Sequence, residues 1–182
     1  MFNQSQNKRV KDSMERLSLA LFDLMKTYSY AEINIRQLCA AAGVTRRTFY
    51  RSFETKDDII DYIIYSRLYY SWDYEKAQSF EETILSFYRF WATRKNDLQI
   101  FEQQHIFYIL TDKIAKYFEM NSVLASLITE QNDIMTFGAY FWAAFLASMI
   151  KTLEVWSSRD FKETPEQLTR MTINGFRCFK NV

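Results

Sequence analysis

A single glycine between two short amphipathic segments is the feature that most restricts how this chain can fold. Upstream of it, Asn34 can cap a helix while Gln37 reaches back to the cap, so a helix is predicted to begin directly afterwards. Gly43 can adopt the left-handed conformation that closes a helix, and Thr45 can cap a second helix just beyond it. Two short helices joined by such a turn are typical of a helix-turn-helix.

The second helix of this motif has an apolar side and a basic side. Phe49 and Phe53 are spaced at i and i+4, so they are expected to pack inward against the first helix. Arg46, Arg47 and Tyr50 lie on the opposite side. An arginine in the first turn of such a helix can bind guanine in the major groove, although exposed arginines on helices are usually only solvated. The pattern favours DNA binding.

Residues 34–56, NIRQLCAAAGVTRRTFYRSFETK, resemble the DNA-binding motif of the TetR family of bacterial transcriptional regulators, and the resemblance covers residues 10–65. The residues that this resemblance assigns to DNA are Arg36 and Arg46 for bases, and Thr48, Tyr50 and Lys56 for phosphates, with Thr45 as a helix cap and further candidate contact. It also implies a dimer formed by the last two long helices and a pocket for an effector. The C-terminal part resembles a subgroup of this family whose members often have no known ligand.

Three residues depart from the family pattern. Cys39 stands where alanine is usual and is expected to be a small buried packing residue. Ser52 stands where histidine or tyrosine is common, which puts one phosphate contact in doubt. Arg47 stands where glycine is frequent, and it either replaces that contact or is only solvated.

The fold class expected from the sequence is all-α. Glycine and proline number three and one in 182 residues, and no alternating β-branched run appears. A first helix with an apolar stripe completes a three-helix DNA-binding domain over residues 1–54, and a larger helical domain over residues 55–182 is expected to begin with a helix capped by Thr55. The stripe consists of Leu17, Ala20, Leu21, Leu24, Met25 and Tyr28. Further helices are predicted over residues 79–95, 97–104, 106–120, 131–157 and 165–179.

Small residues on the helix predicted over residues 131–157 permit close approach of another helix, so with the last helix they are expected to form a two-fold four-helix interface. The candidates for this interface are Ala139, Ala143, Leu146, Ala147, Ile150, Leu168, Met171 and Gly175. An ordinary monomer core would produce the same pattern.

Aromatic residues are concentrated in the second domain, where such side chains can line a ligand pocket. The candidate pocket residues are Phe87, Trp91, Phe101, His105, Tyr108, Phe137, Phe141 and Phe145. A helical aromatic stripe is also what a plain core requires.

Several classes of protein are disfavoured. His105 is the only histidine, no Cys/His cluster has the spacing of metal ligands and no glycine-rich phosphate loop is present, so we expect no enzyme, metal or cofactor. The longest apolar run, residues 139–150, is too short to cross a bilayer, and the first residues show no signal-peptide core. Two distant cysteines favour a reducing cytoplasm.

The sequence therefore predicts a cytoplasmic homodimeric repressor that binds a palindromic DNA operator and is released by a small hydrophobic or aromatic effector. Two alternatives remain open at this point. One is a ligand-responsive transcriptional activator, and the other is a helical module that contacts a protein partner and has no specific operator.

Overall fold

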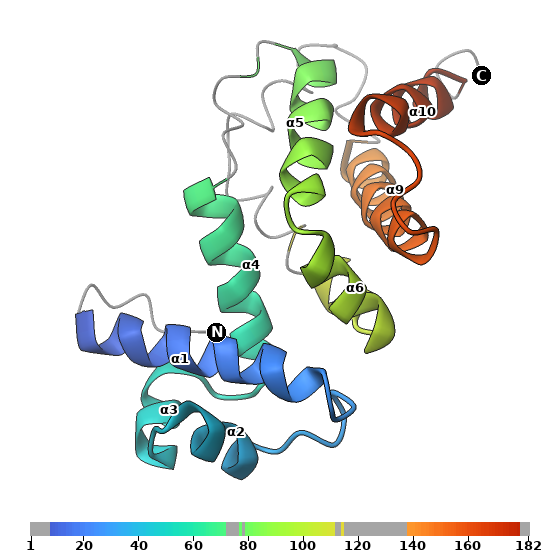
Figure 1. Ribbon diagram of the computed structural model, residues 1–182. Helices are drawn as coiled ribbons and strands as arrows, with labels where there is room; N and C mark the ends of the chain where they lie inside the picture. The colour runs from blue at the N-terminus through green and yellow to red at the C-terminus, as the bar shows by residue number, and fades with distance from the viewer. Residues whose placement is uncertain (1–7, 72–76, 78, 112–113, 115–137, 179–182) are drawn as a thin grey trace.

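The computed structural model describes residues 8–71, 77, 79–111, 114 and 138–178, and every element in this part of the chain is a helix (Figure 1). The expected all-α class is confirmed. The helices are α1 (Lys8–Met25), α2 (Ile35–Ala42), α3 (Arg46–Ser52), α4 (Asp57–Ser71), α5 (Phe80–Ala92), α6 (Lys95–Gln103), α9 (Gly138–Ser158) and α10 (Pro165–Cys178), and residues 107–111 are also helical.

Helices α1, α2 and α3 form a small bundle at the lower end of the molecule in Figure 1. Leu17 of α1, Leu38 of α2 and Phe49 of α3 are completely buried, so each helix contributes its apolar face to one shared core. The last member of the predicted stripe, Tyr28, lies beyond the end of α1. α1 ends at Met25, and Tyr28 lies in the following turn with 44% of its surface exposed.

Helix α4 rises from this bundle toward the rest of the protein and packs on α1 through an isoleucine-rich face (Figure 1). The helix begins at Asp57, two residues after Thr55, the cap expected from the sequence. The Asp58 carboxylate accepts hydrogen bonds from the backbone N–H groups of Glu54 and Thr55, both at 2.9 Å. The first turn of α4 is therefore tied to the two residues that lead into it.

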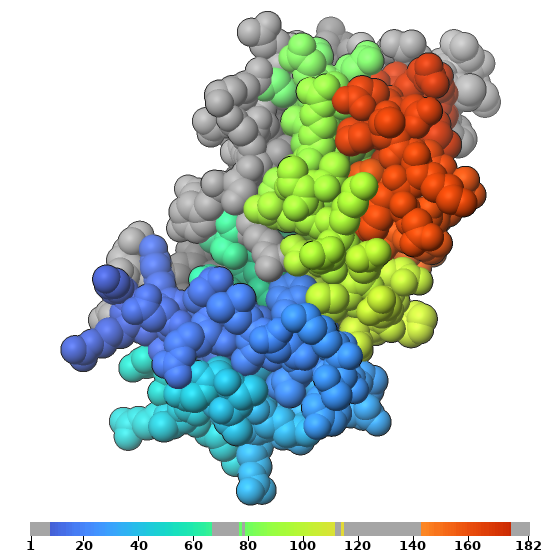
Figure 2. All heavy atoms as spheres, in the orientation of Figure 1, coloured from blue at the N-terminus to red at the C-terminus, as the bar shows by residue number. Residues whose placement is uncertain are grey.

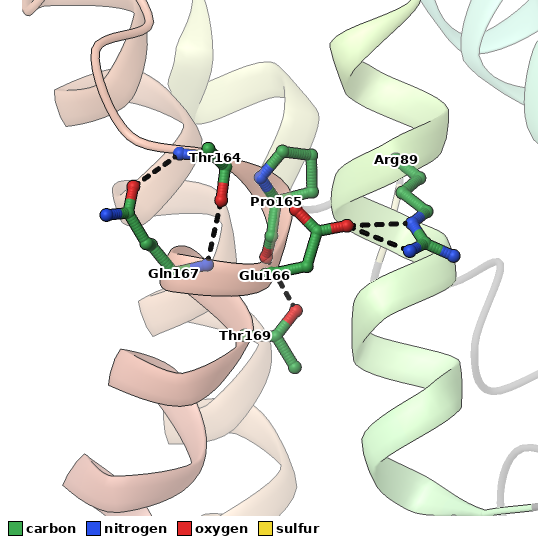
Figure 3. Close-up of polar contacts among 6 residues, drawn as sticks. All are labelled: Arg89, Thr164, Pro165, Glu166, Gln167 and Thr169. Carbon is green, nitrogen blue, oxygen red and sulfur yellow. Dashed lines mark hydrogen bonds and ion pairs between the residues drawn. The ribbon is translucent and has the colours of Figure 1, made fainter.

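The upper part of the molecule packs α10 on α5 and α9 on α6. Tyr88 of α5 is hydrogen-bonded to Thr172 of α10 at 2.8 Å, and Arg89 forms a 2.8 Å ion pair with Glu166 (Figure 3). The ion pair is largely exposed and contributes little, because water screens such pairs. The polar contacts therefore align two helices that apolar packing holds together.

The last helix begins at the predicted position. The hydroxyl of Thr164 accepts from the backbone N–H of Gln167 at 3.2 Å, and the Gln167 side chain accepts from the N–H of Thr164 at 2.8 Å (Figure 3). Pro165 occupies the first helical position, where its missing N–H costs nothing. This reciprocal cap confirms the start of α10 expected from the sequence.

Candidate nucleic-acid interface

The turn between α2 and α3 has the predicted geometry. Asn34 accepts from the N–H of Gln37 at 3.0 Å, and Gln37 accepts from the N–H of Asn34 at 3.1 Å, so α2 begins with a complete capping box. Gly43 has φ 60° and ψ 39°, the left-handed conformation that L side chains rarely adopt. The glycine closes α2 and directs the chain into α3.

Arg16 holds this turn from α1, a contact that the sequence did not predict. Its guanidinium donates to the carbonyl oxygen of Gly43 at 2.8 Å. A Cβ atom added at Gly43 would lie 2.6 Å from the Arg16 Nη2 atom. No local pattern indicates this bond, because the two residues are 27 positions apart.

Helix α3 separates a buried side from an exposed side. The Thr45 hydroxyl accepts from the N–H of Thr48 at 3.1 Å and caps the helix, as predicted. Phe49 is 0% exposed and Phe53 is 1% exposed, with their ring centroids 5.8 Å apart. The inward face expected from their i, i+4 spacing is therefore present, and it fixes the rotation of α3 about its axis.

On the outer side, Arg46, Arg47 and Tyr50 are exposed, as is Arg36 on α2. The Arg46 guanidinium lies 5.9 Å from the centroid of the Tyr50 ring, which in turn packs edge-on against Phe49 at 5.2 Å. A hydrogen bond to Tyr50 raises the pKa of the Arg46 guanidinium further above its ordinary value, so this residue stays charged. α3 thus presents cationic and hydrogen-bonding groups together on one face.

Lys56 has a different environment from the one expected of a phosphate contact. Its ammonium donates to the backbone carbonyls of Tyr30, Ala31 and Ile33, the last two at 3.2 and 3.0 Å, and lies 4.4 Å from the centroid of the Tyr30 ring. An ammonium has three N–H donors, so all of them have partners within the protein. Burial lowers the pKa of Lys56, and the nearby Asp57 carboxylate opposes this change. The lysine ties the start of α4 to the connection between α1 and α2.

Two of the three residues that depart from the family pattern, Cys39 and Ser52, point inward. Cys39 is 4% exposed, and burial raises the pKa of its thiol, in agreement with the expected packing role. Ser52 is 3% exposed, and in the described part of the chain its hydroxyl has no hydrogen-bond partner. Arg47 is exposed beside Arg46. Its side chain is therefore accessible for a phosphate contact, whereas the buried Ser52 is not.

The candidate pocket residues divide into two groups. Phe87, Trp91, Phe101 and Phe145 are at most 2% exposed and pack against other rings. His105 and Tyr108 instead line an open groove of about 310 Å³ between residues 102–111 and α9. Phe137 lies outside the described residues, as does the side chain of Phe141. Aromatic content alone did not distinguish core positions from groove positions.

The candidate dimer residues divide in a similar way. Ala143, Ala147, Met171 and Gly175 are exposed on α9 and α10, and a Cβ atom at Gly175 would have no neighbour within 4 Å. Leu146, Ile150 and Leu168 are at most 5% exposed and belong to the core of the protomer. The side chain of Ala139 lies outside the described residues.

Among the described residues, no group of three or more histidine, cysteine, aspartate or glutamate side chains could hold a metal ion. In the same ranges, no helix combines the length and apolar character needed to cross a bilayer.

A three-helix bundle with a capped glycine turn and an exposed basic helix face defines a helix-turn-helix DNA-binding protein. Residues 20–63 match the model of the family described as bacterial regulatory proteins, tetR family. The N-terminal part of the chain therefore carries a TetR-type DNA-binding domain, as the sequence resemblance indicated. None of the curated proteins compared with this chain matches it.

The whole chain is similar in fold to a solved structure, Lin0861 from Listeria innocua. The two superpose with a TM-score of 0.78 over 97% of this chain and 96% of that one, at 17% sequence identity. At this level of identity the likeness shows the fold alone. It extends the comparison beyond residues 20–63 to the helices of the C-terminal part.

Proposed function

We propose that this protein is a transcriptional repressor that binds a palindromic operator as a homodimer. The observation that supports it most is the division of α3, with Phe49 buried in the bundle and Arg46, Arg47 and Tyr50 exposed. In this proposal Arg46 and Arg36 contact base edges, where a bidentate arginine contact with guanine is worth about 1–3 kcal/mol of discrimination.

The phosphate contacts in this proposal come from Thr45, Thr48, Tyr50 and Arg47. Contacts to the phosphate backbone set the register of a protein on DNA and carry no sequence information directly. We leave Lys56 out of this set, since its three N–H groups already bind protein carbonyls.

The proposed dimer uses the side of the molecule where α9 and α10 lie, away from α2 and α3 (Figures 1 and 2). Exposed Ala143, Ala147 and Gly175 permit close helix packing, and Met171, 63% exposed, is an apolar side chain that a partner would cover. Two copies would then place their α3 helices in successive major grooves, about 34–36 Å apart. Light scattering of the purified protein tests the oligomeric state directly.

The proposed release depends on a small hydrophobic or aromatic effector. The groove lined by His105 and Tyr108, at about 310 Å³, is at the lower end of the usual range of small-molecule sites. An effector can shift operator binding only by its differential affinity for the two states, typically about 1–3 kcal/mol. A reporter gene behind the operator distinguishes repression from activation, because both use the same DNA contacts.

The decisive experiment selects operators from random-sequence DNA with the purified protein. Arg46→Ala and Tyr50→Ala are expected to abolish the enrichment, while Arg170→Ala, an exposed arginine of α10, serves as the matched control and is expected to select the same sequence as the parent. Circular dichroism verifies that each variant is folded. If the parent enriches no sequence at low salt, the operator hypothesis is wrong and a protein partner becomes the better explanation.

A further inference from the structure

Helix α6 and the residue that follows it contact α1 at two points, and these points are three residues apart in both segments. The rings of Phe101 and Phe22 lie 5.8 Å apart, and one turn further along, the Gln104 side chain meets the end of α1 at Met25. In Figure 1 the lower end of α6 lies close to the C-terminal end of α1. One of the two points is apolar and the other is polar.

Gln104 uses both ends of its amide in this contact. Its Nε2 atom donates to the carbonyls of Met25 at 2.6 Å and Tyr28 at 3.2 Å, and its Oε1 atom accepts from the N–H of Tyr30 at 2.5 Å. The last carbonyls of a helix have no partner within the helix. Gln104 therefore completes the end of α1 from a position 79 residues further along the chain.

Tyr30 connects this contact to α4. Its hydroxyl donates to the Asp57 carboxylate at 2.5 Å, and its carbonyl and ring both bind the Lys56 ammonium. Tyr30 is only 6% exposed, and burial together with the bond to Asp57 raises the pKa of its phenol far above the ordinary value. One buried residue thus receives contacts from the start of α4 and from the end of α6.

The turn after α6 fixes the direction in which Gln104 points. His105 adopts φ 54°, its N–H binds the Glu102 carbonyl at 3.0 Å, and the N–H of Ile106 binds the carbonyl of Phe101 at 3.0 Å. These bonds close α6 and hold the backbone of Gln104 against the connection that follows α1. The Gln104 amide thus makes three hydrogen bonds to the backbone, whereas the neighbouring Gln103 is exposed.

We propose that Gln104 is a positioning residue for DNA binding, which sets the orientation of the α1–α3 bundle on the upper helices through Tyr30 and the end of α1. The inference rests on the proposed operator binding and adds to it the route by which the upper helices act on α3. When the amide contacts are lost, the bundle samples orientations that cannot bind both half-sites, and the apparent affinity falls in proportion to the competent fraction.

The test compares Gln104→Met with Gln103→Met, which places the same substitution on the neighbouring exposed glutamine. Amide hydrogen exchange at Tyr30 is expected to accelerate in Gln104→Met, because that N–H loses its acceptor, and to stay unchanged in Gln103→Met. Operator affinity of Gln104→Met is expected to fall by about 10-fold, within the usual range of coupling between sites. Affinity is measured well below the unfolding midpoint of each variant, so that loss of folded protein does not contribute.

Two results would overturn the positioning role. One is a folded Gln104→Met variant that binds the operator within about 2-fold of the parent, since a residue of purely structural importance lowers the unfolding midpoint without changing affinity. The other is unchanged exchange at Tyr30. Failure of the proposed function is seen separately, because the parent protein itself would then select no operator, and that result removes the positioning role as well.

Discussion

Replacing Lys56 with methionine is expected to weaken the fold of the N-terminal bundle rather than its attraction to DNA. Methionine keeps an unbranched side chain against the Tyr30 ring but removes the ammonium that binds the carbonyls of Tyr30, Ala31 and Ile33. The start of α4 then loses its polar attachment to the connection between α1 and α2.

The size of the effect follows from the contacts of Lys56. Three hydrogen bonds at about 1 kcal/mol each give a loss of roughly 3 kcal/mol, and the hydration that the half-buried carbonyls regain reduces this to about 2 kcal/mol. In a protein of 182 residues, about 2 kcal/mol corresponds to a fall of roughly 4–8 °C in the unfolding midpoint.

The assay pairs Lys56→Met with Arg47→Ala. Thermal unfolding is expected to show the loss only in Lys56→Met, because Arg47 is exposed. The dependence of operator affinity on salt is expected to weaken only in Arg47→Ala, by about one counterion, because one phosphate contact is removed. The reasoning would be refuted by the opposite result, a Lys56→Met variant with an unchanged unfolding midpoint and a reduced salt dependence.

Three further predictions concern Tyr30 and two glycines. The raised pKa of the Tyr30 phenol means that the folded state keeps this proton above pH 10 while the unfolded state loses it, so stability falls as pH rises past about 10. Urea unfolding between pH 7 and pH 11 should therefore show a smaller fall in stability for Tyr30→Phe than for the parent. Gly43→Ala forces a side chain into φ 60° and against Arg16, and calorimetry should show a loss of about 1–2 kcal/mol; an unchanged midpoint would contradict the assigned strain. Gly175→Ala adds a methyl group to open space on a helix, so an isolated protomer should gain about 0.5–1 kcal/mol of stability. A loss of stability together with a loss of dimer in light scattering would instead place Gly175 in a close interface.

The features that could be predicted from the sequence are those with short-range causes. The box of Asn34 and Gln37, the closure at Gly43 and the cap at Thr45 each depend on residues within a few positions, and all are present. The inward rotation of α3 also follows from local spacing, since Phe49 and Phe53 share one face.

The features that escaped prediction depend on partners far away in the chain. Lys56 matches the family motif in type and spacing, yet its carbonyl partners are 23 to 26 residues upstream. The partners of Gln104 are 74 to 79 residues away, and polar residues at helix ends carry no signal for such contacts. The concentration of aromatic residues correctly predicted an apolar environment for Phe87 and Trp91. It could not show whether their rings pack against other rings, as they do, or line a cavity.

The shared contacts of Tyr30 also set where this regulator can be cut and rejoined. A chimera joined at residues 54/55 would take Tyr30 from one parent and the residues at positions 56 and 57 from the other, so a second parent without Lys56 and Asp57 would leave the transplanted bundle without these contacts. An exchange of residues 8–71, grafted onto a body that keeps glutamine at position 104, carries the whole set of contacts intact. Under the proposed operator binding, the unit to exchange in order to change operator preference is therefore longer than the unit proposed to contact DNA.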